Sequence, residues 1–335
     1  MDTLLKSFQN TTILVIGDVM IDCYLSGKVT RISPEAPVPI MNVQKRDYRP
    51  GGAANVALNL QSLGAHPILC SVIGNDEKGT IFRSLMEKQE FGTEALEVSP
   101  NRKTTIKYRI IGNQAQMLRV DDEDDRTIDD DTTDRILSGI QRLIEKRKPD
   151  AIIFVDYDKG VLHPDLIRSV IEMARRHRIY TSVDPKKRNF SHYGGVDLFK
   201  PNLKEFSEGL RIPQEEMDTD LLKKVMKQFA TDQGIGRIMT TLSEKGILFY
   251  DHEKNSFYVQ PAYKRTISDV SGAGDTVMSI ATLCMVQGLP MEMITSLANM
   301  GGGLVCEQIG VVPVTAESLR NEYIRRTGKH NIEVL

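Results

Sequence analysis

Asp269-Val-Ser-Gly-Ala-Gly-Asp275-Thr276, followed directly by the apolar run Val-Met-Ser-Ile-Ala-Thr-Leu-Cys-Met-Val, is the stretch that most strongly indicates fold and chemistry. The small residues at 271–274 let the backbone turn tightly and bring its N–H groups close to a ligand. The apolar run predicts a helix, so these groups lie at a helix N-terminus, which carries unsatisfied donors and partial positive charge. Such an end binds phosphate, and a carboxylate beside it can take a proton from an attacking hydroxyl. The stretch is therefore equipped for phosphoryl transfer to an alcohol.

A purely structural interpretation of the same residues is also open. Ser271 or Gly272 can cap the helix, and Asp275 can simply occupy its first turn, where aspartate is common. Taken alone, the stretch favours capping. Polar residues that follow other predicted strands shift the balance toward catalysis.

The composition is that of an ordinary globular chain. The 335 residues are 40% hydrophobic, which is enough for a sizeable core. Lysine and arginine number 43 against 45 acids, a formal charge of −2, so nothing favours binding to nucleic acid or to an anionic membrane surface. The four cysteines are scattered without a CxxC pair, and neither a signal peptide nor a membrane-length apolar run is visible. We therefore expect a cytoplasmic protein with reduced thiols.

Short apolar runs alternate with amphipathic segments along most of the chain. The runs predict buried strands at 12–17, 67–74, 151–155, 180–183, 196–199 and 237–241. The segments predict helices at 53–63, 79–89, 132–147, 164–178 and 221–232. This alternation is typical of βαβ units, so we expect an α/β fold with a doubly wound, mainly parallel sheet flanked by helices.

Two regions interrupt that alternation. Residues 23–49 and 104–120 carry strand-like runs around turn residues, which is typical of β-hairpins inserted into an α/β body. We interpret them together as a small β-sheet lid on one domain spanning residues 1–335. Such a sheet can close over a ligand, make a dimer contact, or do both. The five acids Asp121–Asp125 are more typical of a solvated loop leading into the next helix than of a metal site.

Polar residues follow the first predicted strand and open the first long helix. Ligands of open α/β sheets bind beyond the carboxyl ends of the strands, and Asp18 and Asp22 lie there. They can accept hydrogen bonds from substrate hydroxyls or form Asx-turns. The turn Gly51-Gly52-Ala-Ala-Asn55 can hold sugar hydroxyls or simply pack the helix on the sheet.

Charged pairs follow two later strands at the same edge. Asp156-Tyr-Asp-Lys159 and Asp184-Pro-Lys186 each set a carboxylate beside a lysine. Lysines there can neutralise phosphate, and either pair can also be a rim salt bridge of little energetic weight.

A possible metal site lies after another strand. Asn202 and Glu205 are three residues apart and can orient Mg²⁺ through water, or can form a helix capping box. Neither a GxxxxGKS/T phosphate loop nor a GxGxxG after the first strand is present, so a nucleotide must be held in another way.

Taken in order, these pieces resemble a known enzyme family. The chain is similar to the ribokinase (PfkB-type) carbohydrate kinases over about residues 11–327, through Gly51-Gly52…Asn55, Gly74-Asn-Asp-Glu-Lys-Gly79, Asn202-x-x-Glu205, Thr241-Leu-Ser-Glu-Lys-Gly246 and Asp269-Val-Ser-Gly-Ala-Gly-Asp275. Within that family it resembles the heptose 7-phosphate kinases of lipopolysaccharide-core precursor synthesis, through Gly17-Asp-Val-Met-Ile-Asp22, Arg31-Ile-Ser-Pro-Glu-Ala-Pro-Val-Pro39, Arg49-Pro-Gly-Gly-Ala-Ala-Asn55, Asp156-Tyr-x-Lys159-Gly160 and Asp184-Pro-Lys186.

The resemblance implies roles for the matching positions. Asp275 is the catalytic base, and the N–H groups of Gly272, Ala273 and Gly274 form the anion hole for the transferring phosphoryl group. The substrate-binding candidates are Asp18, Asp22, Gly51, Gly52, Asn55 and Asp156, with Lys107, Arg109, Lys159 and Lys186 as cations for a substrate phosphate. Asn202 and Glu205 belong to the Mg²⁺–phosphate site. The ATP positions are Asn202, Thr241, Ser243, Gly246 and Asn299.

The chain also departs from the family pattern. Ser243 stands where ribokinases often have glycine, and Val270 replaces the usual threonine, which bears on a monovalent-cation site, such as one for K⁺, near Asp269. The His-x-Gly-His motif of a fused nucleotidyltransferase is absent, so we expect adenylylation to be left to another protein.

We therefore expect an ATP- and Mg²⁺-dependent kinase of D-glycero-D-manno-heptose 7-phosphate that makes the 1,7-bisphosphate for ADP-heptose synthesis. A sibling kinase for another sugar, such as fructose 1-phosphate or ribose, is the nearest alternative, and a non-catalytic sugar-binding regulatory protein is a more distant one. The missing dinucleotide fingerprint disfavours an oxidoreductase. The expected partners are the sugar phosphate, ATP and a second copy of the chain joined through the lid strands.

Overall fold

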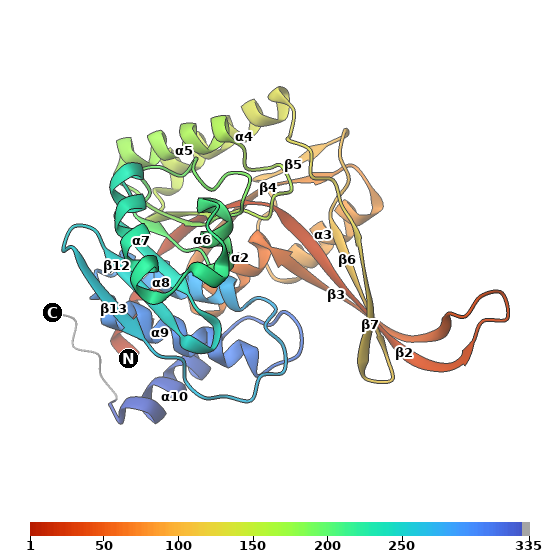
Figure 1. Ribbon diagram of the computed structural model, residues 1–335. Helices are drawn as coiled ribbons and strands as arrows, with labels where there is room; N and C mark the ends of the chain where they lie inside the picture. Colours follow the sequence, from red (N-terminus) through yellow and green to blue (C-terminus); the bar gives the residue numbers. More distant parts are fainter. Residues whose placement is uncertain (330–335) are drawn as a thin grey trace.

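The main body is built around one large sheet. A computed structural model describes residues 1–329, and within them nine strands pair in the order β13-β12-β11-β10-β9-β8-β1-β4-β5 (Figure 1). These strands are β1 (Thr12–Gly17), β4 (His66–Gly74), β5 (Leu96–Ser99), β8 (Ala151–Val155), β9 (Tyr180–Asp184), β10 (Leu198–Phe199), β11 (Arg237–Thr241), β12 (Ile247–Asp251) and β13 (Ser256–Gln260). Neighbours from β5 to β11 run parallel, while β12 and β13 are antiparallel. The expected doubly wound, mainly parallel sheet is confirmed.

Helices cover both faces of this sheet. One face carries α1 (Asp2–Phe8), α2 (Ala53–Ser62), α3 (Glu77–Lys88), α8 (Ala273–Val286), α9 (Met291–Cys306) and α10 (Ala316–Thr327), and the other carries α4 (Asp130–Arg147), α5 (Pro164–His177), α6 (Leu203–Leu210) and α7 (Thr219–Gln233). Figure 1 shows α4 and α5 on the side opposite α8 and α9. The alternation of side chains along a strand explains the two cores. In β1, Ile13 and Val15 join the first core, whereas Leu14 and Ile16 join the second.

Four strands form a second, smaller sheet that projects from the body (Figure 1). They are β2 (Val19–Ile32), β3 (Pro39–Gly52), β6 (Ile106–Gly112) and β7 (Ala115–Asp122), in the order β3-β2-β6-β7. Two antiparallel hairpins are joined by parallel pairing of β2 with β6. This sheet, called the lid, is the one expected from residues 23–49 and 104–120. Its first hairpin also reaches the body, because β3 ends at Gly52, where α2 begins.

Some elements differ from the sequence-based expectation. The strand expected at 196–199 is shortened to Leu198–Phe199, and the edge hairpin β12–β13 and the short strand β5 were not expected. Short edge strands carry weak periodicity, and pairing with a neighbour defines them more than their own residues do. In the described part of the chain, no helix combines the length and apolar character needed to cross a bilayer.

Candidate active site

Asp275 lies in the first turn of helix α8, as the sequence predicts. The helix begins at Ala273, and Gly272 before it is left-handed, with φ 81°. A side chain on Gly272 would also lie 2.9 Å from the Asn55 amide nitrogen, so this turn requires glycine. We call residues 271–274 the anion turn, because its N–H groups lie at the helix N-terminus, where anions bind.

The Asp275 carboxylate is buried and is held by two side chains. Asn55 Nδ2 donates a 2.6 Å hydrogen bond to Oδ2, and the Tyr157 hydroxyl donates one of 2.9 Å to Oδ1. Burial raises the pKa of Asp275 to about 6. The Asp184 carboxylate adds to this rise, whereas the two hydrogen bonds and the charge of Lys200 oppose it. A carboxylate with a pKa this near neutrality suits a general base.

Asp275 does not cap its own helix. No side chain makes a cap hydrogen bond at the start of α8, and both Asp275 oxygens instead contact Asn55 and Tyr157. Asp269 organises the turn: its Oδ1 accepts from Ser271 N–H and its Oδ2 from Gly310 N–H, each at 2.9 Å. Gly272 is the N-cap residue and Asp275 lies in the first turn, as the structural interpretation expected, and the catalytic role of Asp275 stays a prediction. The expected monovalent-cation site near Asp269 stays a prediction.

Sequence reasoning missed two groups beside Asp275. Tyr157 lies within the Asp156–Lys159 segment, and Lys200 directly precedes the Pro-Asn202 pair, so adjacency to these motifs was the available signal. Lys200 is only 2% exposed and forms a 3.0 Å ion pair with Asp184. A side chain on Gly274 would lie 3.6 Å from Asp184 Oδ2 and 3.7 Å from Lys200 Nζ. This buried ion pair therefore faces the anion turn.

The candidate sugar-binding residues lie where the lid meets the body. Asp22 of β2 is buried and forms an ion pair with Arg109 of β6. Burial raises the pKa of Asp22, although the Arg109 charge opposes the rise. A side chain on Gly51 would lie 2.3 Å from Asp22 Oδ2, so glycine is needed there, and Gly52 is left-handed before α2. Asn55 connects this group to the buried carboxylate of α8.

Asp18 and Asp156 are already engaged by protein groups. Asp18 accepts hydrogen bonds from three backbone N–H groups in the loop after β8, at residues 157, 159 and 161. Burial raises the pKa of Asp18 to about 6, and the nearby Asp156 charge adds to the rise. Asp156 accepts from Asn189 Nδ2 and the Tyr193 hydroxyl. Asp18 therefore braces the loop after β8, Asp156 connects that loop to the loop after β9, and contact of either with substrate stays a prediction.

The four candidate phosphate cations do not form one cluster. Lys107 of the lid and Lys159 of the body both contact the Glu123 carboxylate, at 3.4 and 2.7 Å. Lys186 pairs instead with Glu205 at the start of α6. The fourth cation, Arg109, pairs with Asp22. Lys107 and Lys159 are therefore the two that share a site.

The five acids Asp121–Asp125 are exposed or half-buried, and the last three lie in the expected loop before α4, but all five form ion pairs. Asp121 and Asp122 end strand β7. The five carboxylates pair as Asp121 with Lys107 and Arg119, Asp122 with Lys78 and Lys103, Glu123 with Lys107 and Lys159, Asp124 with Arg126, and Asp125 with Arg188. Acids that repel one another along the chain pair with cations from the lid, α3 and four loops. Across residues 1–329 there is no cluster of three His, Cys, Asp or Glu side chains suited to a metal.

Asn202 and Glu205 form a capping box at the start of α6. Asn202 Oδ1 accepts from Glu205 N–H, and Glu205 Oε2 accepts from Asn202 N–H, both at 2.8 Å. The other oxygen of Glu205 pairs with Lys186. Burial alone would lower the pKa of Lys186, but the Asp184 and Glu205 carboxylates outweigh it and raise that pKa. The capping interpretation is confirmed, and the Mg²⁺ role stays a prediction.

The ATP candidates flank the same end of the sheet. Thr241, at the end of β11, bridges to Asn202. Ser243 is left-handed and exposed. Gly246 has φ 97°, and a side chain there would lie 2.0 Å from the carbonyl oxygen of residue 260, so residue 246 must be glycine. Asn299 of α9 donates a 2.8 Å hydrogen bond to the carbonyl of residue 261. Gly246 and Asn299 therefore both contact the segment that follows β13.

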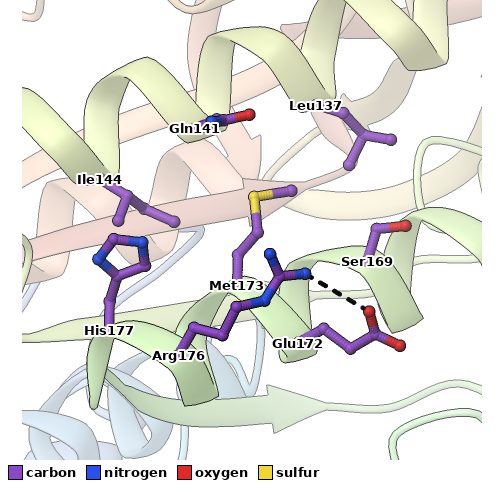
Figure 2. A pocket seen from close by; sticks show the side chains of 8 residues that line it. All are labelled: Leu137, Gln141, Ile144, Ser169, Glu172, Met173, Arg176 and His177. Atoms are coloured by element: carbon purple, nitrogen blue, oxygen red, sulfur yellow. Dashed lines mark ion pairs between the residues drawn. The ribbon is translucent and has the colours of Figure 1, made fainter.

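Two surface hollows lie away from the candidate site residues. Figure 2 shows one of about 280 Å³ between α4 and α5, lined by Leu137, Gln141, Ile144, Ser169, Glu172, Met173, Arg176 and His177. In it, Arg176 pairs with Glu172 at 3.7 Å. A second hollow includes residues 148–150 and 178–180, at the amino ends of β8 and β9. Neither contains a candidate site residue.

Curated proteins of similar sequence include several named "Bifunctional protein HldE". "Bifunctional protein HldE" of Koribacter versatilis is 37% identical over 325 residues, and that of Caulobacter vibrioides is 38% identical over 315 residues. These alignments cover 95% and 94% of this chain, but only 64% of each relative. The chain therefore spans slightly less than two thirds of the length of these relatives.

Solved structures and a family model complete the comparison. Phosphofructokinase-2 from Escherichia coli in complex with substrates and products superposes with a TM-score of 0.76 at 15% identity, covering 94% of this chain and 99% of that one. Ribokinase from Arabidopsis thaliana, complexed with ribose and ATP, gives 0.71 at 15% identity, covering 93% and 98%. The fold is thus ribokinase-like. Residues 10–317 match the model of the pfkB family of carbohydrate kinases, and the chain belongs to that family.

Proposed function

We propose that this carbohydrate kinase uses ATP and Mg²⁺ to phosphorylate the anomeric hydroxyl of D-glycero-D-manno-heptose 7-phosphate. The observation that carries phosphoryl transfer is the buried Asp275 carboxylate, whose pKa burial raises to about 6. It lies in the first turn of α8, beside the anion turn. A base beside an anion-binding helix end matches what transfer to an alcohol needs.

In this reaction Asp275 takes the proton of the sugar hydroxyl. The hydroxyl oxygen bonds to the γ-phosphorus of ATP, and the bond from that phosphorus to the bridging oxygen breaks, releasing ADP. Positioning and electrostatic stabilisation supply most of the catalysis in such a transfer. The N–H groups of the anion turn provide the stabilisation, together with Lys200, which faces Gly274, and Lys186, which lies within electrostatic range of Asp275.

Asn202, Glu205 and Asp184 are the residues that would hold Mg²⁺. All three offer oxygen donors, which Mg²⁺ prefers, and it takes few protein ligands because it keeps several waters. Asp184 Oδ1 is buried and lacks a hydrogen-bond partner within the described residues, so this oxygen is free to face an ion or its water. Bound Mg²⁺ would neutralise the nucleotide phosphates.

Several observations support heptose 7-phosphate as the substrate. The curated relatives at 37–38% identity carry the HldE name, and the segments at 17–22, 31–39 and 49–55 resemble heptose 7-phosphate kinases. Lys107 of the lid and Lys159 of the body share the Glu123 carboxylate, so two cations converge on one anionic group. A substrate phosphate can occupy such a position with charge-assisted hydrogen bonds.

The substrate is tested with a panel of free and phosphorylated sugars. ATP consumption is measured for each sugar, and phosphorus NMR identifies the position of the new phosphate. We expect the highest kcat/KM for heptose 7-phosphate and a new anomeric phosphate. A preference for free heptose, fructose 1-phosphate or ribose would reassign the substrate within the kinase family. ATP consumption with none of the sugars would favour a non-catalytic sugar-binding protein.

We also propose a homodimer joined through the lids. Several large apolar side chains of the lid are exposed: Ile32, Val38, Val43, Met117, Leu118 and Val120. Strands β3 and β7 are the edges of this four-stranded sheet, so each presents unpaired backbone groups. A second lid packed against these side chains would remove them from water.

A further inference from the structure

Two lid residues, Arg49 and Tyr24, contact the loop at residues 309–311, which follows α9. Arg49, on β3, donates hydrogen bonds from Nη1 to the carbonyls of Ile309 and Val311, at 3.3 and 3.2 Å. The Tyr24 hydroxyl, on β2, accepts one of 3.2 Å from Val311 N–H. Gly310 has φ 76°, and a side chain there would lie 2.8 Å from Arg49 Nη1 and 2.9 Å from the Tyr24 hydroxyl. The loop at 309–311 is thus tightly fitted to these two lid residues.

The same loop holds the anion turn. Gly310 N–H donates to Asp269 Oδ2, and Asp269 Oδ1 accepts from Ser271 N–H, both at 2.9 Å. A side chain on Gly272 would lie 3.5 Å from the Val311 side chain, which is ordinary packing contact. The Asp269 carboxylate therefore connects the loop at 309–311 directly to the anion turn.

Further contacts connect Tyr24 to Asp22, the candidate sugar-binding residue of the lid. The Tyr24 ring lies between two guanidinium groups, with Arg49 Cζ at 4.8 Å and Arg109 Cζ at 5.4 Å from its centroid. Arg109 pairs with Asp22, the candidate ligand of a sugar hydroxyl. Asp47, also on β3, accepts hydrogen bonds from Arg49 Nε and Nη2 and fixes the direction of that guanidinium.

We propose that Arg49, assisted by Tyr24, is a positioning residue that sets the anion turn relative to the lid, so that donor and acceptor sites form together. Arg49 suits this task because its planar guanidinium directs Nη1 toward the two carbonyls and Nε and Nη2 toward the Asp47 carboxylate, a fixed spread of donors that the compact ammonium of lysine does not have. This inference rests on the proposed kinase reaction. It does not depend on which sugar is the acceptor.

The proposal predicts that replacing Arg49 lowers kcat and leaves both KM values nearly unchanged. The hydrogen bonds of Arg49 go to Asp47 and to the loop at 309–311, so its loss should leave binding of ATP and sugar nearly unchanged. Misplacement of reacting groups by about 1 Å can cost about 100-fold in rate. We therefore expect Arg49→Met, which keeps an apolar stem of similar length, to lower kcat by about 10- to 100-fold with both KM values within about threefold of wild type.

The test compares matched variants with ATP and heptose 7-phosphate, measuring kcat, both KM values and the melting temperature. Arg46→Met is the control, because Arg46 is exposed on the same strand and contacts the Tyr48 hydroxyl rather than the loop at 309–311. Arg49→Lys should be intermediate, since the ammonium keeps the charge and can donate to a carbonyl but lacks the fixed fork that also bonds Asp47. Tyr24→Phe removes only the hydroxyl that accepts from Val311, and it tests the same contact should Arg49→Met fail to fold.

Two results would overturn the proposal. One is a kcat within about twofold of wild type for both Arg49→Lys and Tyr24→Phe. The other is a loss of activity in folded Arg49→Met that lies in KM, with kcat within about twofold of wild type. Failure of wild-type enzyme to accept heptose 7-phosphate would count against the proposed substrate instead, and the same variants would then be compared with the sugar that the panel identifies.

Discussion

Replacing Asp275 by asparagine separates the catalytic role of this carboxylate from its effect on stability. Asparagine keeps the shape, and its carbonyl oxygen can still accept a hydrogen bond from Asn55 or Tyr157, the two partners in the structure. The substitution removes the basicity. Loss of a general base costs about 10²- to 10⁴-fold in rate, so we expect Asp275→Asn to abolish most turnover while ATP still binds.

The same substitution should stabilise the fold above neutral pH. Burial raises the pKa of Asp275 from 3.8 to about 6, so the folded protein resists ionisation of this group. The destabilisation is fully present above about pH 6 and disappears as the pH falls toward 4, because the unfolded chain then also binds the proton. At about 1.4 kcal/mol per pKa unit, the gain in unfolding free energy at pH 8 is at most about 3 kcal/mol. The lost charge-assisted hydrogen bonds reduce it.

Three measurements check this reasoning. Steady-state turnover gives kcat, nucleotide titration gives ATP affinity, and urea unfolding at pH 8 and pH 4 gives the stability difference. In wild type, kcat/KM should fall tenfold per pH unit below about pH 6, since only ionised Asp275 is a base. Asp251→Asn is the control: Asp251 is a buried aspartate on β12, paired with Arg237, and its replacement should lower stability and leave kcat unchanged.

The refuting result is specific. If Asp275→Asn keeps more than about a tenth of the wild-type kcat, a loss worth only about 1.4 kcal/mol, then Asp275 is not the base. Reduced stability at pH 8 would independently show that the hydrogen bonds outweigh the cost of the buried charge.

Three further predictions concern the metal, the substrate phosphate and the dimer. Glu205→Gln should raise the Mg²⁺ concentration needed for half-maximal activity while keeping the capping box, because the glutamine oxygen can still accept from Asn202 N–H; an unchanged Mg²⁺ titration would assign Glu205 to capping alone. Lys159→Met should raise KM for heptose 7-phosphate far more than it lowers kcat, and should leave activity on free heptose unchanged; equal losses on both sugars would show that Lys159 serves ATP or the fold. Leu118→Lys should convert the dimer to monomers in sedimentation, and a monomeric wild type at micromolar concentration would refute the lid dimer.

Local patterns in the chain predicted much of the architecture. The run after residue 272 is helix α8, and the interrupted regions at 23–49 and 104–120 are the lid strands. These features depend on side-chain periodicity and on glycine at tight turns, which act over a few residues. The candidate catalytic aspartate was found for the same reason, because the turn and the helix that position it are contiguous.

The sequence did not reveal which groups surround that aspartate. Tyr157 was missed, although its hydroxyl bonds Asp275 directly, and the buried Lys200–Asp184 pair was also missed. The acidic run was expected to be solvated, yet its carboxylates pair with lysines and arginines from several elements. Glu205 was consistent with two roles, and only the structure showed that the capping box forms.

By itself, then, the sequence determined the layered α/β fold, the lid and the position of Asp275 at a helix start. Tertiary structure alone decided the environment of that carboxylate, since Asn55 and Asp275 lie 220 residues apart in the chain and meet at 2.6 Å. It also decided which carboxylate each candidate phosphate cation pairs with. The physical reason is range: periodicity and turn conformation are set by near neighbours, whereas burial, ion pairing and a pKa near 6 depend on segments that only folding brings together.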